Sequence, residues 1–110
     1  MIAQVELDAV SVISLSGYID ADTAPLLYQR LTNLRRDGHR QFVVDCSAVT
    51  YISSHGVWTV LKHTLELRQE GGDIRLAAVT ESVAMIIQDL RIEKHLSLYP
   101  TVAAAVASFD

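Results

Sequence analysis

Residues 42–56 read FVVDCSAVTYISSHG, and this stretch decides the fold. It opens with the short apolar run of residues 42–46, which ends in polar residues as a central β-strand buried on both faces does. Two serines then stand where apolar side chains begin to recur at helical spacing. We therefore expect a strand over 42–46, a loop over 47–54 at the carboxyl end of that strand, and a helix from Ser54 to about Glu70.

The residues before this stretch predict a hairpin and a helix. The segments 2–7 and 10–16 are rich in β-branched residues and are separated by two residues, which indicates two antiparallel strands joined by a tight turn. A helix follows, with Asp22 as its N-cap, Pro25 in its first turn and Gly38 at its end. Its expected apolar face consists of Ala24, Leu27, Tyr28, Leu31 and Leu34.

The residues after the stretch predict further alternation of helices and strands. The glycine pair 71–72 closes the second helix, and residues 74–79 form the next strand. A third helix is expected over 83–90, a short edge strand over 95–99, and a last helix over 102–109. The expected apolar face of the second helix consists of Val57, Val60, Leu61, Thr64 and Leu65.

The composition fits one globular domain over residues 1–110. Half of the residues are apolar and a fifth are charged, which excludes a disordered or loop-dominated chain. The sequence contains no internal repeat and no linker-like tract. We expect a single α/β sandwich with a mixed sheet of four to five strands and about four helices, in the order ββαβαβα(β)α.

The charge and the cysteine content narrow the classes of partner. Nine Lys and Arg against thirteen Asp and Glu give a net charge of −4, the wrong sign for binding nucleic acid or anionic lipid. The chain has no signal-peptide pattern and no apolar run long enough to span a membrane. The lone Cys46 cannot form an internal disulfide and is expected to be a buried, apolar residue. We therefore expect a cytoplasmic protein without membrane insertion and without a cofactor.

The histidines do not indicate a metal site or a hydrolase. His55 and His63 are eight residues apart, too far for a one-turn metal pair, and His39 and His95 have no neighbouring Cys or Glu group. Ser54 and His55 are adjacent at a helix start, so their side chains point in different directions, and no G-x-S-x-G motif is present. We expect neither a catalytic residue nor a bound metal.

The two serines at the start of the second helix are the candidate functional residues. Free backbone N–H groups and the positive end of the helix dipole converge at this point. A phosphate on Ser54 would carry a charge of about −1.5 to −2, which that environment favours. Alternatively, Ser53 or Ser54 only caps the helix, a role worth about 1 kcal/mol. The residues by themselves are compatible with both interpretations.

Two segments carry a family resemblance. Residues 17–24, GYIDADTA, match a pattern of Gly, a variable residue, an aliphatic residue, Asp, and then Thr-Ala. Residues 45–56, DCSAVTYISSHG, match Asp, any, Ser, any, Val, any, aromatic, aliphatic, Asp or Ser, Ser, any, Gly. The glycine pair 71–72 and the tail over 101–109 also fit. In this order and spacing, over nearly the whole chain, the sequence resembles the STAS family of bacterial anti-sigma factor antagonists.

The resemblance implies a phosphorylation switch. In the family, the serine three places after the aromatic residue is phosphorylated by a partner kinase that is also the anti-sigma factor; counted from Tyr51, this serine is Ser54. The unphosphorylated protein would bind the kinase and release the sigma factor, and a serine phosphatase would reverse the modification. Many members have Asp at the position of Ser53, so Ser53 is the second candidate acceptor.

The resemblance also implies a partner-binding surface around the start of the second helix. Asp20 corresponds to a loop acid of the family and is expected to approach Ser54, or else to serve only as a turn residue. Trp58 lies about 100° round the helix from Val57, so it either covers the edge of the core or contacts a partner. His55 and Trp58 replace small residues of the family. The expected contact residues are Asp20, Asp22, Ser53, Ser54, His55, Gly56 and Trp58.

Other interpretations remain open. A STAS domain could instead be a subunit of a transporter or a stress-signalling scaffold, with the serine acting only as a cap. A response-regulator receiver domain would use Asp45 at the end of the central strand. It would also need an acidic pair between its first strand and a helix, and a lysine after a late strand. Here the acidic pair Glu6 and Asp8 precedes a hairpin, and the only lysines are Lys62 and Lys94. A homodimer is an alternative to a monomer.

Overall fold

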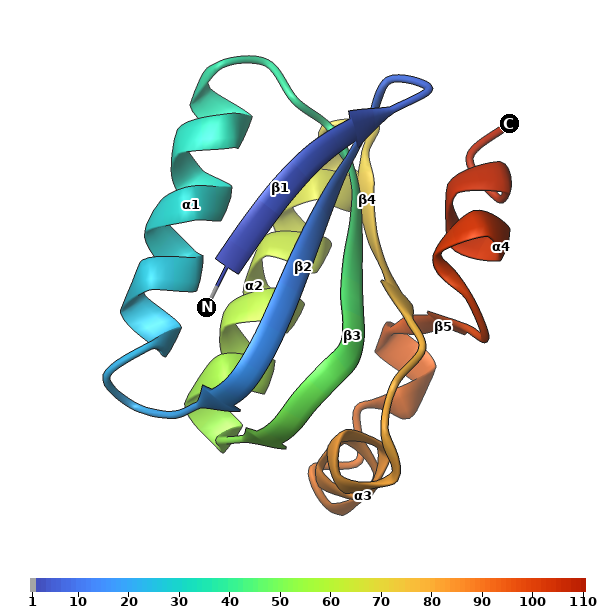
Figure 1. The fold of residues 1–110 in the computed structure, drawn as a ribbon. Helices are drawn as coiled ribbons and strands as arrows, with labels where there is room; N and C mark the ends of the chain where they lie inside the picture. The colour runs from blue at the N-terminus through green and yellow to red at the C-terminus, as the bar shows by residue number, and fades with distance from the viewer. Residues whose placement is uncertain (1) are drawn as a thin grey trace.

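The computed structural model describes residues 2–110, and its strands form one mixed sheet in the order β1-β2-β3-β4-β5 (Figure 1). β1 is antiparallel to β2, and every other neighbouring pair is parallel. The elements are β1 (Ile2–Leu7), β2 (Val10–Ile19), α1 (Ala24–Arg36), β3 (Gln41–Ile52), α2 (Ser54–Gln69), β4 (Asp73–Ala77), α3 (Glu81–Asp89), a 3₁₀ turn (Glu93–His95), β5 (Ser97–Tyr99) and α4 (Val102–Ala107). This order confirms the predicted α/β sandwich.

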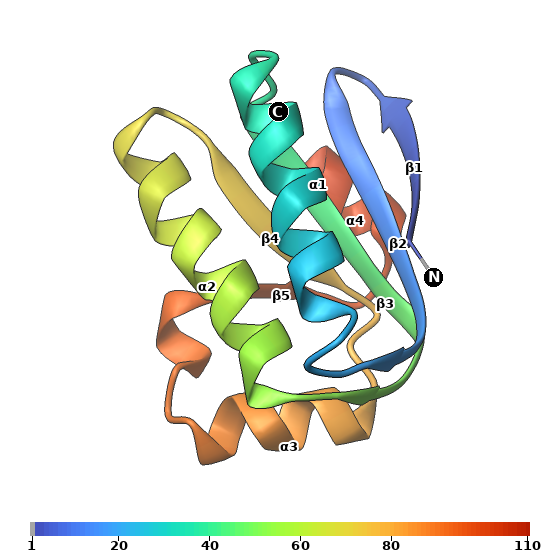
Figure 2. The ribbon, with the colours of Figure 1, turned by 90° about the vertical axis from the view of Figure 1, so that its left-hand side faces the viewer.

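Helices cover both faces of the sheet. α1 and α2 lie side by side on one face, and α4 lies on the other (Figures 1 and 2). β3 is buried on both sides: Phe42 and Val44 join the larger core under α1 and α2, whereas Val43 joins the smaller core under α4. This two-sided burial confirms the prediction that the apolar run is a central strand. Within residues 2–110, no helix is both long and apolar enough to cross a membrane.

The prediction of a loop over residues 47–54 is wrong for most of its length, because β3 continues to Ile52. β2 likewise runs past its predicted end to Ile19. The two extensions pair with each other in parallel, across register shifts between Ser14 and Ser16 and between Gly17 and Tyr18. The polar residues of this stretch lie in a half-exposed strand, where burial of Val49 and Ile52 holds it to the core.

The predicted cap and two predicted core positions of the helices also differ from the structure. The residue before α1 is Thr23, not Asp22, which is exposed in the preceding turn. Tyr28 is exposed in the seam between α1 and α2, where its hydroxyl lies 3.1 Å from Lys62 Nζ. Leu65 is exposed, because the buried position in that turn of α2 belongs to Leu67.

Three elements are shorter than the sequence pattern predicts. β4 ends at Ala77 because Ala78 adopts a left-handed backbone with φ of 54°. His95 ends the 3₁₀ turn, so β5 begins only at Ser97. α4 ends at Ala107. The predicted end of α2 is confirmed: Gly71 has a φ of 87°, and the Gly72 N–H donates to the Leu67 carbonyl at 2.8 Å, the pattern of a Schellman C-cap.

Candidate functional site

The start of α2 lies beside the loop that joins β2 to α1. Ile19 and Ile52 are paired neighbours at the ends of β2 and β3, and the Ser53 N–H donates to the Ile19 carbonyl at 2.7 Å. Asp20 and Ser53 directly follow these two residues, and both loops emerge at the same end of the sheet (Figure 1). The structure therefore brings the two signature segments of the sequence together.

The two adjacent serines occupy different positions. Ser53 is the N-cap of α2, and its Oγ accepts a hydrogen bond from the Gly56 N–H at 3.3 Å. Ser54 is the first residue of the helix and is exposed to solvent. Within residues 2–110, its hydroxyl has no hydrogen-bond partner. The hydroxyl of Ser53 thus caps the helix, whereas that of Ser54 is exposed.

Asp20 is held in place by the turn that follows it. Its Oδ1 accepts hydrogen bonds from the backbone N–H groups of Asp22 and Thr23, at 3.0 and 3.1 Å, and from the Thr23 hydroxyl at 3.1 Å. These bonds, led by that of the Thr23 N–H, lower the pKa of Asp20. Asp20 is therefore an ionised turn residue at neutral pH, and Asp22 adds a second exposed carboxylate to the same loop.

Gly56 does not belong to an accessible surface, contrary to our expectation. It is buried, and a Cβ atom at this position would lie 2.8 Å from Ile52 Cγ1 and 3.0 Å from Ile19 Cγ2. The glycine lets the first turn of α2 approach the ends of β2 and β3 closely. Its role is to position the serines.

Two bulky side chains flank the exposed serine. His55 is exposed and lines a shallow groove between α1 and α2. Trp58 is 47% exposed, which rules out a purely internal role and leaves a large aromatic surface next to the first turn of α2. The groove is lined by Ala21, Ala24, Pro25, Tyr28, His55 and Thr59.

An ionic cluster that was not predicted from the sequence joins α1 to α2. Arg35 donates to Glu66 at 2.7 Å and to Glu70 at 2.9 Å, and it also reaches His63 Nδ1 at 2.8 Å. The only sequence signal was the i, i+4 spacing of the two glutamates on α2. The cluster links the two helices at the end of the seam far from Ser54. Within residues 2–110, no group of His, Cys, Asp and Glu side chains is arranged to hold a metal ion.

His63 in this cluster is buried and uncharged at neutral pH. Its residue exposure is 1%, and burial together with the Arg35 cation lowers its pKa from 6.5 to about 4; Glu66 opposes the shift and Lys62 adds to it. A guanidinium group only donates hydrogen bonds, so His63 Nδ1 accepts and the ring proton lies on Nε2.

We expect the fold to lose stability as the pH falls from about 6.5 towards 4. The unfolded chain takes up a proton at His63 in this range and the folded chain does not, which destabilises the fold by about 2 kcal/mol at pH 4.5. Urea unfolding at pH 7.5 and pH 4.5 measures the difference. His63→Asn retains an acceptor for Arg35 and should lose most of this pH dependence. A full pH dependence in His63→Asn, or an equal loss in the exposed control His95→Asn, would contradict the assignment.

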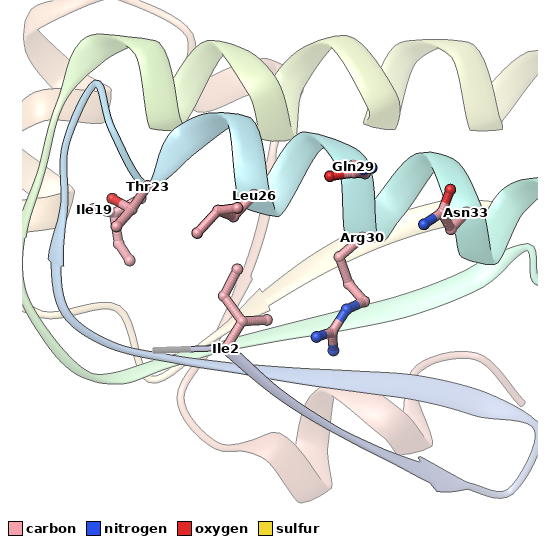
Figure 3. Close-up of a pocket in the computed structure, with 7 residues that line it drawn as sticks. All are labelled: Ile2, Ile19, Thr23, Leu26, Gln29, Arg30 and Asn33. Atoms are coloured by element: carbon pink, nitrogen blue, oxygen red, sulfur yellow. The ribbon is translucent and has the colours of Figure 1, made fainter.

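A second groove, of about 350 Å³, lies between β1 and α1 at the edge of the sheet (Figure 3). Ile2 from β1 and Leu26 from α1 face each other across it, and Arg30 extends from α1 towards β1. Its remaining lining residues are Ile19, Thr23, Gln29 and Asn33. None of the expected contact residues lines this groove.

Comparison with known proteins assigns the family. The STAS domain family matches residues 1–105, and the chain belongs to this family. It is 30% identical to an anti-sigma factor antagonist from Mycobacterium paratuberculosis, whose crystal structure superposes with a TM-score of 0.88 over 98% of this chain and 92% of that one. It is 29% identical to BtrV of Bordetella bronchiseptica, provisionally named an anti-sigma factor antagonist, over 94% of this chain and 90% of BtrV.

The fold is also that of SpoIIAA from Bacillus, an anti-sigma factor antagonist. Its unphosphorylated form has a TM-score of 0.86 at 17% identity, covering 99% of this chain and 96% of SpoIIAA. Its phosphorylated form has a TM-score of 0.79 at 16% identity, covering the whole of both chains. At these identities the similarity is one of fold. The chain is thus a STAS domain whose homologues include anti-sigma factor antagonists.

Proposed function

We propose that this protein is an anti-sigma factor antagonist that binds an anti-sigma factor serine kinase until Ser54 is phosphorylated. The homologous antagonists support the first part of the proposal. The observation that carries the second part is the free, exposed hydroxyl of Ser54 at the first position of α2, beside a serine whose own hydroxyl caps the helix. SpoIIAA, which has the same fold, exists in a phosphorylated form.

A phosphate on Ser54 would be tolerated by the fold but not by a bound partner. The N-terminus of α2 offers its dipole and the unbonded N–H groups of its first turn, which favour an anion. In a complex, the same dianion would lose its hydration and lie close to Asp20 and Asp22. Phosphorylation would therefore leave the domain folded while it ends the binding.

The partner would contact both loops at this end of the sheet. Asp20 and Asp22 present fixed charge, and Ser54, His55 and Trp58 present the accessible side of the first turn of α2. Ser53 and Gly56 act indirectly, by shaping that turn. No catalytic group is required in this chain: the kinase supplies the phosphoryl transfer, a serine phosphatase reverses it, and the sigma factor is released in the cytoplasm while the antagonist holds the kinase.

The test is phosphate transfer by the kinase that copurifies with this protein from a native lysate. Incubation with ATP should add one phosphate to the native chain, measured by intact mass and located by fragmentation. Ser54→Ala should abolish this addition completely and keep the melting temperature, because the cap on Ser53 is untouched. The matched control Ser53→Ala should still be labelled, at a cost of about 1 kcal/mol in stability for the lost cap.

Two results would contradict the proposal. Labelling that persists in Ser54→Ala and disappears in Ser53→Ala would move the acceptor by one residue. Copurification with a transporter subunit or a signalling scaffold, without any transfer of phosphate, would assign the domain to the alternative role of an accessory STAS subunit.

A further inference from the structure

β1 forms an open edge of the sheet. Among residues 2–110, nothing pairs with its outer side. Figure 2 shows β1 at the margin of the sheet. Its register with β2 is continuous from Ile2 to Leu7, without a bulge, and the strand contains no Pro or Lys and only one charged residue, Glu6. Natural proteins usually protect an edge strand with a bulge, a proline or several charged residues, because an unprotected edge pairs with another strand. β1 has almost none of this protection.

The face of β1 on the α4 side of the sheet carries exposed apolar side chains. Val5 is 52% exposed and Leu7 is 43% exposed. They pair with Val12 and Val10 of β2, which belong to the smaller core under α4, so all four side chains lie on one face of the sheet. α4 covers the β2 residues but not those of β1. Apolar side chains at a bare edge indicate a surface that another strand completes.

We infer that β1 pairs antiparallel with β1 of a second copy of this chain, with Val5 opposite Val5. This register places Ala3 opposite Leu7 on the apolar face, and Gln4 opposite Glu6 on the other face. The Gln4 amide already donates to Glu6 within one chain, at 2.9 Å, so the same donor and acceptor suit each other across the interface. The Val5–Val5 contact lies on the two-fold axis, and each of the other contacts occurs twice.

Two neighbouring registers also place the apolar faces of both copies on the same side of the sheet, but each pairs side chains less favourably. A shift of the centre to Gln4 places Ile2 opposite the charged Glu6 of the second copy. A shift to Glu6 places two glutamates directly opposite each other, which is destabilising. The sequence of β1 therefore selects the register centred on Val5, and this self-complementarity is the reason to assign the edge to a second copy of the chain.

The groove beside β1 supplies a complementary charge. In the register centred on Val5, Leu7 of the second copy comes opposite Ala3. Asp8, the turn residue that follows Leu7, then lies near the Ile2 end of the facing strand. Arg30 extends from α1 towards β1 beside Ile2 (Figure 3). Neither Asp8 nor Arg30 forms an ion pair within residues 2–110. Dimerisation would bring these two unpaired charges together at both ends of the interface.

This dimer is independent of the proposed phosphorylation switch. The interface lies at the β1 edge, whereas none of the expected partner contacts is on β1. One pair of six-residue strands with flanking contacts is a small interface, so we expect a weak dimer that dissociates in the micromolar to millimolar range. Ser54→Ala should leave the monomer–dimer equilibrium unchanged. A failure to detect phosphorylation of Ser54 would therefore not contradict the dimer.

Cysteine cross-linking tests the register. With copper phenanthroline as oxidant, Val5→Cys should form a disulfide-linked dimer, since directly opposed residues have Cα atoms about 4.5–5.5 Å apart. Ala3→Cys, the matched control, should cross-link at least about tenfold more slowly, because its two copies are about 14 Å apart. A mixture of Ala3→Cys and Leu7→Cys should form the mixed dimer. Cys46 does not compete, because it is buried and burial raises the pKa of its thiol to about 12.

Sedimentation between about 10 µM and 1 mM tests the dimer in solution. The native chain should show a monomer–dimer equilibrium, and Val5→Lys should be monomeric with an unchanged melting temperature, because Val5 is exposed. Arg30→Glu should weaken the dimer about fivefold. Adding Asp8→Asn, which tolerates the left-handed backbone at this turn position (φ of 51°) and removes the opposing negative charge, should recover part of that loss. A native chain that remains monomeric at 1 mM, no recovery in the Arg30→Glu/Asp8→Asn double variant, or equal cross-linking of Ala3→Cys and Val5→Cys would overturn the inference.

Discussion

We expect Ser54→Asp to bind the anti-sigma factor kinase at least about tenfold more weakly than the native chain, a loss of about 1.4 kcal/mol. The new carboxylate would lie on the accessible side of the first turn of α2, at the end of the sheet where the loop that carries Asp20 and Asp22 also begins. On binding, it would have to shed water in the presence of like charges. Titration calorimetry with the purified kinase measures the change in affinity directly.

The matched control for this variant is Ser54→Asn. Its side chain has nearly the size and shape of Asp but no charge, so it should bind within about threefold of the native chain. Neither substitution should unfold the protein: an Asp in the first turn of a helix stabilises it by about 0.3–1 kcal/mol. If Ser54→Asn and Ser54→Asp weaken binding equally, the kinase recognises the shape of the Ser54 side chain and not its charge. Undiminished binding by Ser54→Asp would show that added charge does not cause the release.

The secondary structure was predictable where one local pattern dominates. The β-branched runs that begin the two hairpin strands and the glycine pair after α2 each act over a few residues, and both were confirmed; the third helix was placed within two residues of its observed bounds, Glu81–Asp89. The extension of β3 to Ile52 was not predictable, because residues 47–52 are mostly polar. They form a strand only because β2 runs beside them with two shifts of register. That pairing is a tertiary effect between segments about thirty residues apart.

Side-chain roles were harder to predict than the elements that carry them. Tyr28 has the spacing of a core residue, yet α2 packs so that its ring lies in the seam and its hydroxyl reaches Lys62. Arg35 bonds to residues 28, 31 and 35 positions away, and the i, i+4 spacing of the two glutamates does not indicate which cation they bind.

The candidate site shows the same division. The sequence located the serine pair at the start of a helix, but either serine fits an N-cap by residue type. The roles of Ser53 and Ser54 separate only when the end of β3 is fixed at Ile52, because this boundary makes Ser53 the cap and Ser54 the first helical residue. The mispredicted end of β3 and the open choice between the serines therefore had one common cause.

Gly72→Ala should destabilise the fold by about 3 kcal/mol, which corresponds to a fall of about 13 °C in melting temperature for a chain of 110 residues. Gly72 does not have a left-handed backbone, so alanine could adopt its conformation. A Cβ atom there, however, would overlap the backbone carbonyl of Arg40. That carbonyl accepts a hydrogen bond from the Asp73 N–H at 3.0 Å, so moving it would disrupt the start of the β3–β4 ladder. Thermal unfolding followed by circular dichroism measures the loss.

The neighbouring glycine provides the control, because it has the opposite combination of properties. Gly71 has a φ of 87°, but a Cβ atom at this position meets nothing within 4 Å. Gly71→Ala should therefore lose only the backbone strain, about 1–2 kcal/mol. A larger loss in Gly71→Ala than in Gly72→Ala would mean that the cap of α2, and not the contact between Gly72 and Arg40, limits the stability of this corner. Because the two substitutions add the same methyl group to adjacent residues, they separate two causes of instability: Gly72→Ala reports the close approach of the Arg40 carbonyl, and Gly71→Ala reports the left-handed backbone at the end of α2.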